Sequence, residues 1–276
     1  MTLIDFILNI VGLLLWLNWR AAELPVTARP GTSLLSTLRP AQGPRPRYYY
    51  LGGVVLLLAV RALFYWQAGP RVHWSPQLAL GPTTLAFRAD LLGRMFLFSG
   101  LSFGVSLGIF YVWLLLLSWA NGKVTNADPV QRLIRLWLGR LERWPVAIKL
   151  LLPIVISVAG WYFLHPLLVH LSMVPSITRG RLLAQGAIIG VAACLTLKFL
   201  IVVFLVLYLL NSYVYLGESA LWNFVNATAR RFLQPLRGVP LRAGKIDFAP
   251  LAGIVMVMLA SDAAQRGLRW LYQKLP

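Results

Sequence analysis

The sequence is poor in charge, and above all in acidic charge. Charged side chains make up 12% of its 276 residues, about half of the roughly 25% that soluble globular domains carry. Only eight residues are Asp or Glu, and the chain contains no carboxylate pair, no Ser/His/Asp set in one loop and no glycine-rich phosphate loop. We therefore expect that the protein is not an enzyme and that it binds no cofactor.

Cysteine is almost absent as well. The single cysteine, Cys194, lies in an apolar stretch, which excludes an intrachain disulfide, a CxxC pair and covalent haem attachment. His165 and His170 are five residues apart, which is not metal-site spacing. We expect Cys194 to be a small packing residue and expect no metal site.

Long apolar runs take the place of charge. Hydrophobic residues account for 59% of the chain, and several runs approach the about 20 residues that cross the hydrocarbon core of a bilayer. Lipid offers no hydrogen-bond partner to the backbone, so each run is expected to be a helix. There are six runs: Leu3 to Trp19, Tyr48 to Trp66, Leu91 to Trp119, Val146 to Leu171, Leu182 to Leu216 and Ile246 to Ala260.

The sequence therefore predicts an all-α polytopic membrane protein with about six transmembrane helices. Asp5 lies at the start of the first apolar run, Arg20 follows the run, and no small-residue cleavage site is present, so we expect this segment to remain as an anchor.

The basic residues are concentrated in the first, third and fifth connections. A net charge of +18 would suggest nucleic acid in a soluble protein. In a membrane protein, Lys and Arg mark the cytoplasmic side and face anionic lipid headgroups. We expect the odd connections in the cytoplasm, both termini outside, anionic lipid as a partner and no nucleic acid.

An internal repeat accompanies this alternation. The clusters WLNW, SWAN and LNSY begin at residues 16, 118 and 210, and Pro40, Pro145 and Pro240 follow them about 100 residues apart. The repeat predicts three consecutive helical hairpins. Their expected boundaries are residues 1–90, 91–181 and 182–276, the first hairpin being divergent.

Basic amphipathic segments are expected in the cytoplasmic connections. From Val130 to Trp144, apolar residues follow helical spacing on one side and arginines occupy the other. Such a helix is typical of the membrane interface, and a docking surface for a soluble partner is the alternative. The stretch from Leu221 to Phe232 repeats the pattern less strongly.

Two further patterns lie within the apolar runs. Gly100, Gly104 and Gly108 form a small-residue face for close helix packing, within the chain or between copies in a homo-oligomer. Gly186 and Gly190 form a shorter version of this pattern in the fifth run. Arg61 and Lys198 are intramembrane charges and therefore functional candidates. Arg61 lies five residues from the end of its run and has the alternative of extending to the interface.

The most informative stretch is FLQPLRGVPLRAGKIDFAP, from Phe232 to Pro250. Its prolines predict a structured turn. Asp247 is expected to cap the last helix, with Pro250 in its first turn. The alternative is an ion or ligand site at Asp247.

This stretch resembles the YggT family of small bacterial and plastid membrane proteins, most clearly over residues 215–260. The matching residues are Pro235, Leu236, Arg237, Pro240, Gly244, Ile246, Asp247, Phe248 and Pro250. Members of that family have been linked to cytochrome maturation, to nucleoid or division organisation and to osmotic tolerance. The resemblance implies a scaffold or assembly factor of the bacterial cytoplasmic (inner) membrane, with a membrane-protein partner or a homo-oligomer. The alternative is a small-solute or ion pathway built from hairpin repeats.

Overall fold

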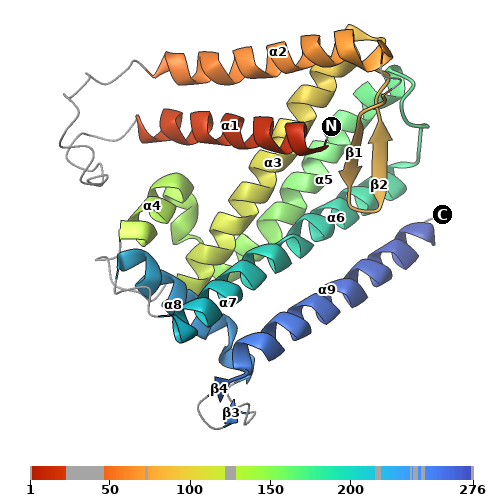
Figure 1. Ribbon diagram of the computed structural model, residues 1–276. Helices are drawn as coiled ribbons and strands as arrows, with labels where there is room; N and C mark the ends of the chain where they lie inside the picture. The colour runs from red at the N-terminus through yellow and green to blue at the C-terminus, as the bar shows by residue number, and fades with distance from the viewer. Residues whose placement is uncertain are drawn as a thin grey trace, which may run out of the picture. The chain divides into compact units, whose positions relative to one another are not determined.

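The computed structural model describes residues 2–22, 47–71, 74–121, 129–214, 219–236, 238, 242–243 and 246–274. Most of these residues are helical (Figure 1). The long helices are α1 (Thr2–Ala21), α2 (Tyr48–Arg71), α3 (Leu92–Asn121), α5 (Val146–His170), α6 (Arg179–Leu195), α7 (Leu197–Tyr213) and α9 (Ala249–Gln273). Shorter helical elements are α4 (Pro129–Leu138), η3 (Gly139–Arg143), α8 (Ala220–Phe232) and η4 (Gln234–Leu236).

Six helical segments of the described chain are long and apolar enough to cross a membrane. Each overlaps one of the six runs expected from the sequence, which supports a helical multi-pass membrane protein. The last helix, however, extends to Gln273, well beyond the expected end at Ala260. The fifth segment spans Arg179–Tyr213, 35 residues, or about 50 Å of helix at 1.5 Å per residue. The regular helical hydrogen bonding is interrupted at Thr196, between α6 and α7, although Thr196 keeps right-handed helical dihedral angles (φ −65°, ψ −18°).

Two small β-hairpins depart from the all-helical expectation. β1 (Gln77–Leu80) pairs with β2 (Thr83–Ala86), and β3 (Arg242–Ala243) pairs with β4 (Ile246–Asp247). In the first hairpin the turn contains Gly81, whose φ is +68°, a backbone conformation that glycine adopts without strain. Leu78, Leu80 and Leu85 are buried, so the strands contribute apolar side chains to the interior.

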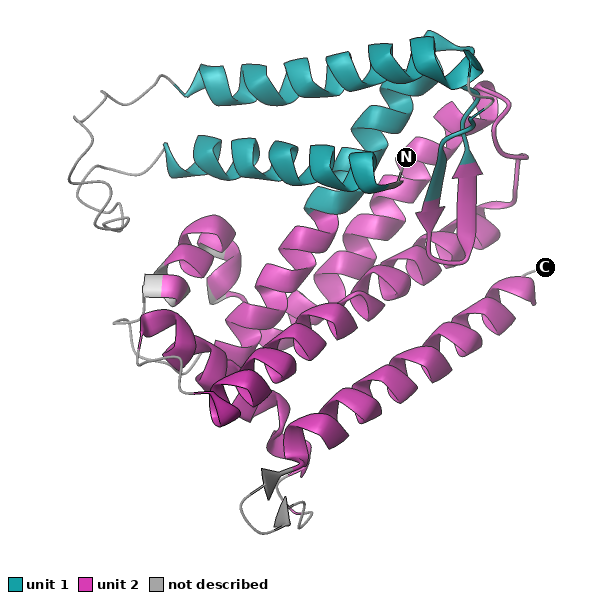
Figure 2. Cartoon of the chain, in the orientation of Figure 1, with its two compact units in different colours: residues 1–78, 86–107 teal, residues 79–85, 108–276 magenta. Residues whose placement is uncertain are grey.

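The described helices form two compact units (Figure 2): residues 1–78 with 86–107, and residues 79–85 with 108–276. This division differs from the three hairpins expected from the sequence. In the first unit α1 packs against α2, and in the second α7 packs against α9. However, α5 packs most extensively against α6, which the predicted boundaries assign to the next hairpin. The three-hairpin arrangement is therefore not confirmed, and the repeat remains a prediction.

The amphipathic segments pack against the protein. Helix α4 and helix α8 are present, but the apolar face of α4 does not lie free for lipid. Ile134 and Leu138 are buried in one cluster with Phe224 and Val225 of α8. Residues of α3 and α7, including Leu115 and Phe204, complete this cluster. The apolar face of α4, which we expected to lie in the membrane interface, instead packs against α8 and against residues of α3 and α7.

Candidate functional site: a buried polar cluster around Arg61

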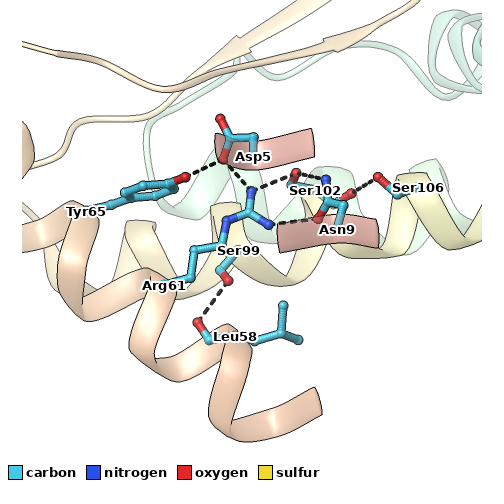
Figure 3. A network of polar contacts seen from close by, with 8 residues as sticks. All are labelled: Asp5, Asn9, Leu58, Arg61, Tyr65, Ser99, Ser102 and Ser106. Carbon is cyan, nitrogen blue, oxygen red and sulfur yellow. Dashed lines mark hydrogen bonds and ion pairs between the residues drawn. The ribbon is translucent and has the colours of Figure 1, made fainter. Parts of the chain in front are cut away.

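Polar side chains from three apolar helices of the first unit meet at one place (Figure 3). Asp5 and Asn9 are four residues apart on α1, and Arg61 and Tyr65 are four residues apart on α2. Residues at this spacing share one face of a helix. With Ser102 of α3, these side chains form what we call the Arg61 cluster.

Arg61 is the centre of the cluster. Its Nη1 donates to Asn9 Oδ1 at 2.8 Å, and its Nη2 donates to Asp5 Oδ1 at 2.8 Å and to Ser102 Oγ at 2.9 Å. The Arg61 side chain is 1% exposed, whereas that of Asp5 is 19% exposed. The charge of Arg61 is thus buried, and its ion-pair partner is the more accessible of the two groups.

The other members complete the network. Tyr65 donates its hydroxyl to Asp5 Oδ1 at 2.7 Å, and Asn9 Nδ2 donates to Ser102 Oγ at 3.1 Å. The guanidinium also lies over the rings of Tyr65 and Phe98, 5.6 and 5.2 Å from their centroids, so cation–π attraction adds to the ion pair.

A carboxylate beside the guanidinium reduces the cost of burying charge. An isolated ion in an apolar interior is strongly unfavourable, and a paired, hydrogen-bonded ion is tolerated. The pair Arg61–Asp5 has no net charge, and its hydrogen bonds join α1 to α2 and α3. The arrangement therefore fixes three helices of one unit against one another.

Arg61 was expected either as a functional candidate or as a side chain that extends to the membrane interface. In the structure the Arg61 side chain is buried and paired with Asp5. The sequence analysis did not identify Asn9 and Tyr65 as members of a polar cluster, and it did not assign a partner to Asp5. The available signal was the spacing of four residues between Asp5 and Asn9 in one apolar run and between Arg61 and Tyr65 in the next.

Lys198 belongs to the second unit and is not part of this cluster. It is the second residue of α7, two positions after the interruption at Thr196. Its side chain is partly buried, with Nζ 5.1 Å from the ring centroid of Phe199. The Thr196 hydroxyl donates to the Ala193 carbonyl at 2.6 Å and accepts from Trp113 Nε1 of α3 at 3.3 Å.

Only part of the YggT-like motif lies in the described residues. Pro235 and Leu236 form η4, and Leu236 packs against a small core that includes Leu205 and Leu233. Pro250 is buried in the first turn of α9, where it was expected. Arg237, Pro240 and Gly244 lie outside the described residues.

The expected cap of the last helix is not seen. The residue at the N-cap of α9 is Phe248, which has no side-chain oxygen. Asp247 precedes it in β4, opposite Arg242 of β3. The helix begins one residue too late for Asp247 to occupy the N-cap itself, and the Asp247 side chain lies outside the described part of the structure.

The predicted glycine face on α3 is open, and a different glycine pair packs closely. Nothing in the described structure lies within 4 Å of a Cβ placed on Gly100, Gly104 or Gly108. By contrast, such an atom on Gly186 would lie 2.8 Å from Val158 Cα, and one on Gly190 would lie 2.7 Å from Ile154 Cα. Close helix packing inside the chain therefore occurs between α6 and α5.

The six apolar helices define a multi-pass helical membrane protein. Comparisons with models of known protein families, with curated protein sequences and with solved structures gave no match to this chain.

Proposed function

We propose that this chain is a non-enzymatic membrane scaffold or assembly factor, related to the YggT family and acting in membrane or envelope organisation. The observation that carries the proposal is the open glycine face of α3. Gly100 and Gly104 in the first unit and Gly108 in the second are exposed, and nothing in the described part of its own unit packs on each of them. Small residues at this spacing let two membrane helices approach closely, so the face fits a helix of a membrane-protein partner or of a second copy.

The Arg61 cluster supports the same role. In a scaffold the positions of the membrane helices must be fixed, and a buried ion pair with several hydrogen bonds fixes α1 and α2 on α3. The proposed location is a bacterial cytoplasmic membrane, with the basic connections inside and the termini outside. Anionic lipid headgroups lie against these basic connections.

Affinity capture from native membranes, after gentle solubilisation, tests the scaffold. We expect the intact chain to retain a membrane-protein partner or a second copy, and Gly104→Leu to lose it. Gly160→Leu is the matched control, because Gly160 is another exposed glycine of a membrane helix with nothing placed within 4 Å of its Cβ. Recovery of the intact chain alone, or equal capture by the two variants, would contradict the proposal.

A second candidate function is a small-solute or ion pathway. The observation that favours it is the partly buried charge of Lys198 within the fifth apolar segment, since ionisable residues inside membrane segments mark substrate and ion pathways. Reconstituted liposomes decide between the two functions. Flux of a common cation or anion above empty vesicles, abolished by Lys198→Gln, would favour the pathway; no flux would remove it.

A further inference from the structure

The second unit contains a cavity of about 200 Å³. It lies between the C-terminal half of α3, the start of α5 and the interruption between α6 and α7. Most of its walls are apolar, formed by side chains such as Val112, Leu115, Pro153 and Leu197. It opens at the surface of the unit, where the lining residues Trp119, Val146 and Leu150 are exposed. For comparison, an apolar cavity of ~150 Å³ in an engineered protein binds benzene. The space therefore accommodates part of a hydrocarbon chain.

Lys149 gives this apolar cavity a positive charge. The side chain is 9% exposed and lines the cavity. Its Nζ donates to Ser118 Oγ at 3.1 Å, which engages one of the three donors of an ammonium group. Within the described residues no carboxylate forms an ion pair with it. A buried cation is strongly unfavourable without a counter-charge.

The position of Lys149 favours an anion at the end of the cavity. It is the fourth residue of α5, and the positive end of a helix dipole attracts negative charge. The preceding connection is the basic one expected at the cytoplasmic surface. A headgroup at this level and a chain among Pro153, Cys194 and Leu197 would match both the charge and the apolar walls.

We propose that this cavity binds an acidic amphiphile, with one hydrocarbon chain among its apolar walls and the anionic headgroup on Lys149 Nζ. The anion is a lipid phosphate or the carboxylate of a free fatty acid. Lys149 binds the headgroup, and Ser118 positions the Lys149 side chain. This site is separate from the Arg61 cluster and does not depend on the scaffold role.

Photo-crosslinking of the full chain in phosphatidylcholine vesicles tests the proposal. Three probes carry the same diazirine on the hydrocarbon chain: phosphatidylglycerol, phosphatidylcholine and a free fatty acid. The measured quantity is the yield of adducts at the cavity wall, on Cys194 and Leu197, divided by the yield at Phe163. Phe163 is the control for general contact with lipid, because its side chain is 78% exposed. We expect this ratio to be several-fold higher for an acidic probe than for phosphatidylcholine. The acidic probe that gives the higher ratio identifies the source of the anion.

Matched variants isolate the charge. Lys149→Gln keeps a donor for Ser118 and should reduce the ratio to that of phosphatidylcholine, whereas Lys149→Arg should retain the preference. Lys198→Gln removes the same charge at a residue that does not line the cavity and lies four positions after Cys194. This variant should also retain the preference for an acidic probe. Equal ratios for all three probes in the unmodified chain would overturn the proposal. An unchanged preference in Lys149→Gln would also overturn it.

Discussion

Arg61 of α2 and Asp5 of α1 form an ion pair in which Nη2 and Oδ1 are 2.8 Å apart and the arginine side chain is 1% exposed. Arg88 and Asp90 are also joined at 2.8 Å, but their side chains are 71% and 48% exposed. Distance alone therefore does not distinguish the two pairs, whereas burial does. Water solvates the charges of the second pair when it breaks, whereas the guanidinium of Arg61 is shielded from solvent by its burial.

Removal of either charge of the buried pair should destabilise the first unit. We expect Asp5→Asn to lower the free energy of unfolding by about 3–5 kcal/mol, because the Arg61 ion is left buried without its partner. Arg61→Gln should cost less, because Asp5 is 19% exposed and keeps its hydrogen bond from Tyr65. The double variant should lose less than the sum of the two. Unfolding in detergent micelles, arranged as a double-mutant cycle, measures this coupling.

Arg88→Gln provides the control, since it removes an arginine from an ion pair of equal length at an exposed site. Its stability should equal that of the unmodified chain. If Arg61→Gln unfolded like Arg88→Gln, the Arg61 cluster would have no role in holding α1.

A second buried contact joins α8 to α3. Asn121 Nδ2 donates to Thr228 Oγ1 at 2.9 Å, and Thr228 is fully buried. We expect Thr228→Val to cost about 1–3 kcal/mol, because the shape is kept while a buried amide loses a partner. Thr228→Ser keeps the hydroxyl and should cost less. Thermal unfolding of both variants compares them, and a larger loss for Thr228→Ser than for Thr228→Val would show that packing of the methyl group, and not the hydrogen bond, is the cause.

Helix positions were predictable from the sequence because one physical rule decides them. Within lipid the backbone has to satisfy its own hydrogen bonds, so an apolar run of sufficient length is a helix. The fourth run was expected from Val146 to Leu171, and the helix extends over Val146–His170. Hydropathy carries this information directly, one segment at a time.

The partners of Arg61 could not be predicted in the same way. Asp5, Arg61 and Ser102 lie on three helices, and their meeting depends on how each helix is rotated about its axis. Helical spacing shows that Asp5 and Asn9 share a face, but not which face of α2 they meet. The interruption at Thr196 was missed for a related reason, since neither glycine nor proline marks it and the hydropathy is continuous there.

Membrane orientation gives a third prediction. With the odd connections in the cytoplasm, cysteine at position 36 should react with an impermeant thiol reagent only from the cytoplasmic side. Cysteine at position 75 should react only from outside. Ser36→Cys and Ser75→Cys, each in a Cys194→Ser background, test this in intact cells and in inverted vesicles. Preferential labelling of position 36 in intact cells would contradict this prediction and indicate the opposite orientation.

The last prediction separates packing inside the chain from packing against a partner. A methyl group on Gly190 would meet the backbone of α5, with its carbon 2.7 Å from Ile154 Cα. Since backbone atoms cannot rotate away as a side chain does, α5 and α6 have to separate. We expect Gly190→Ala to lower the free energy of unfolding by about 1–3 kcal/mol, the usual cost of overpacking.

Gly104→Ala adds the same methyl group to α3, where nothing in the described structure lies within 4 Å of it. The unfolding of the isolated chain should therefore be unchanged or slightly improved, because alanine favours helix more than glycine does. Association with a partner through the glycine face should nevertheless weaken. Unfolding measured on the dissociated chain, together with affinity capture from membranes, gives both quantities. A Gly104→Ala chain that unfolds normally and captures its partner normally would show that this face of α3 meets only lipid.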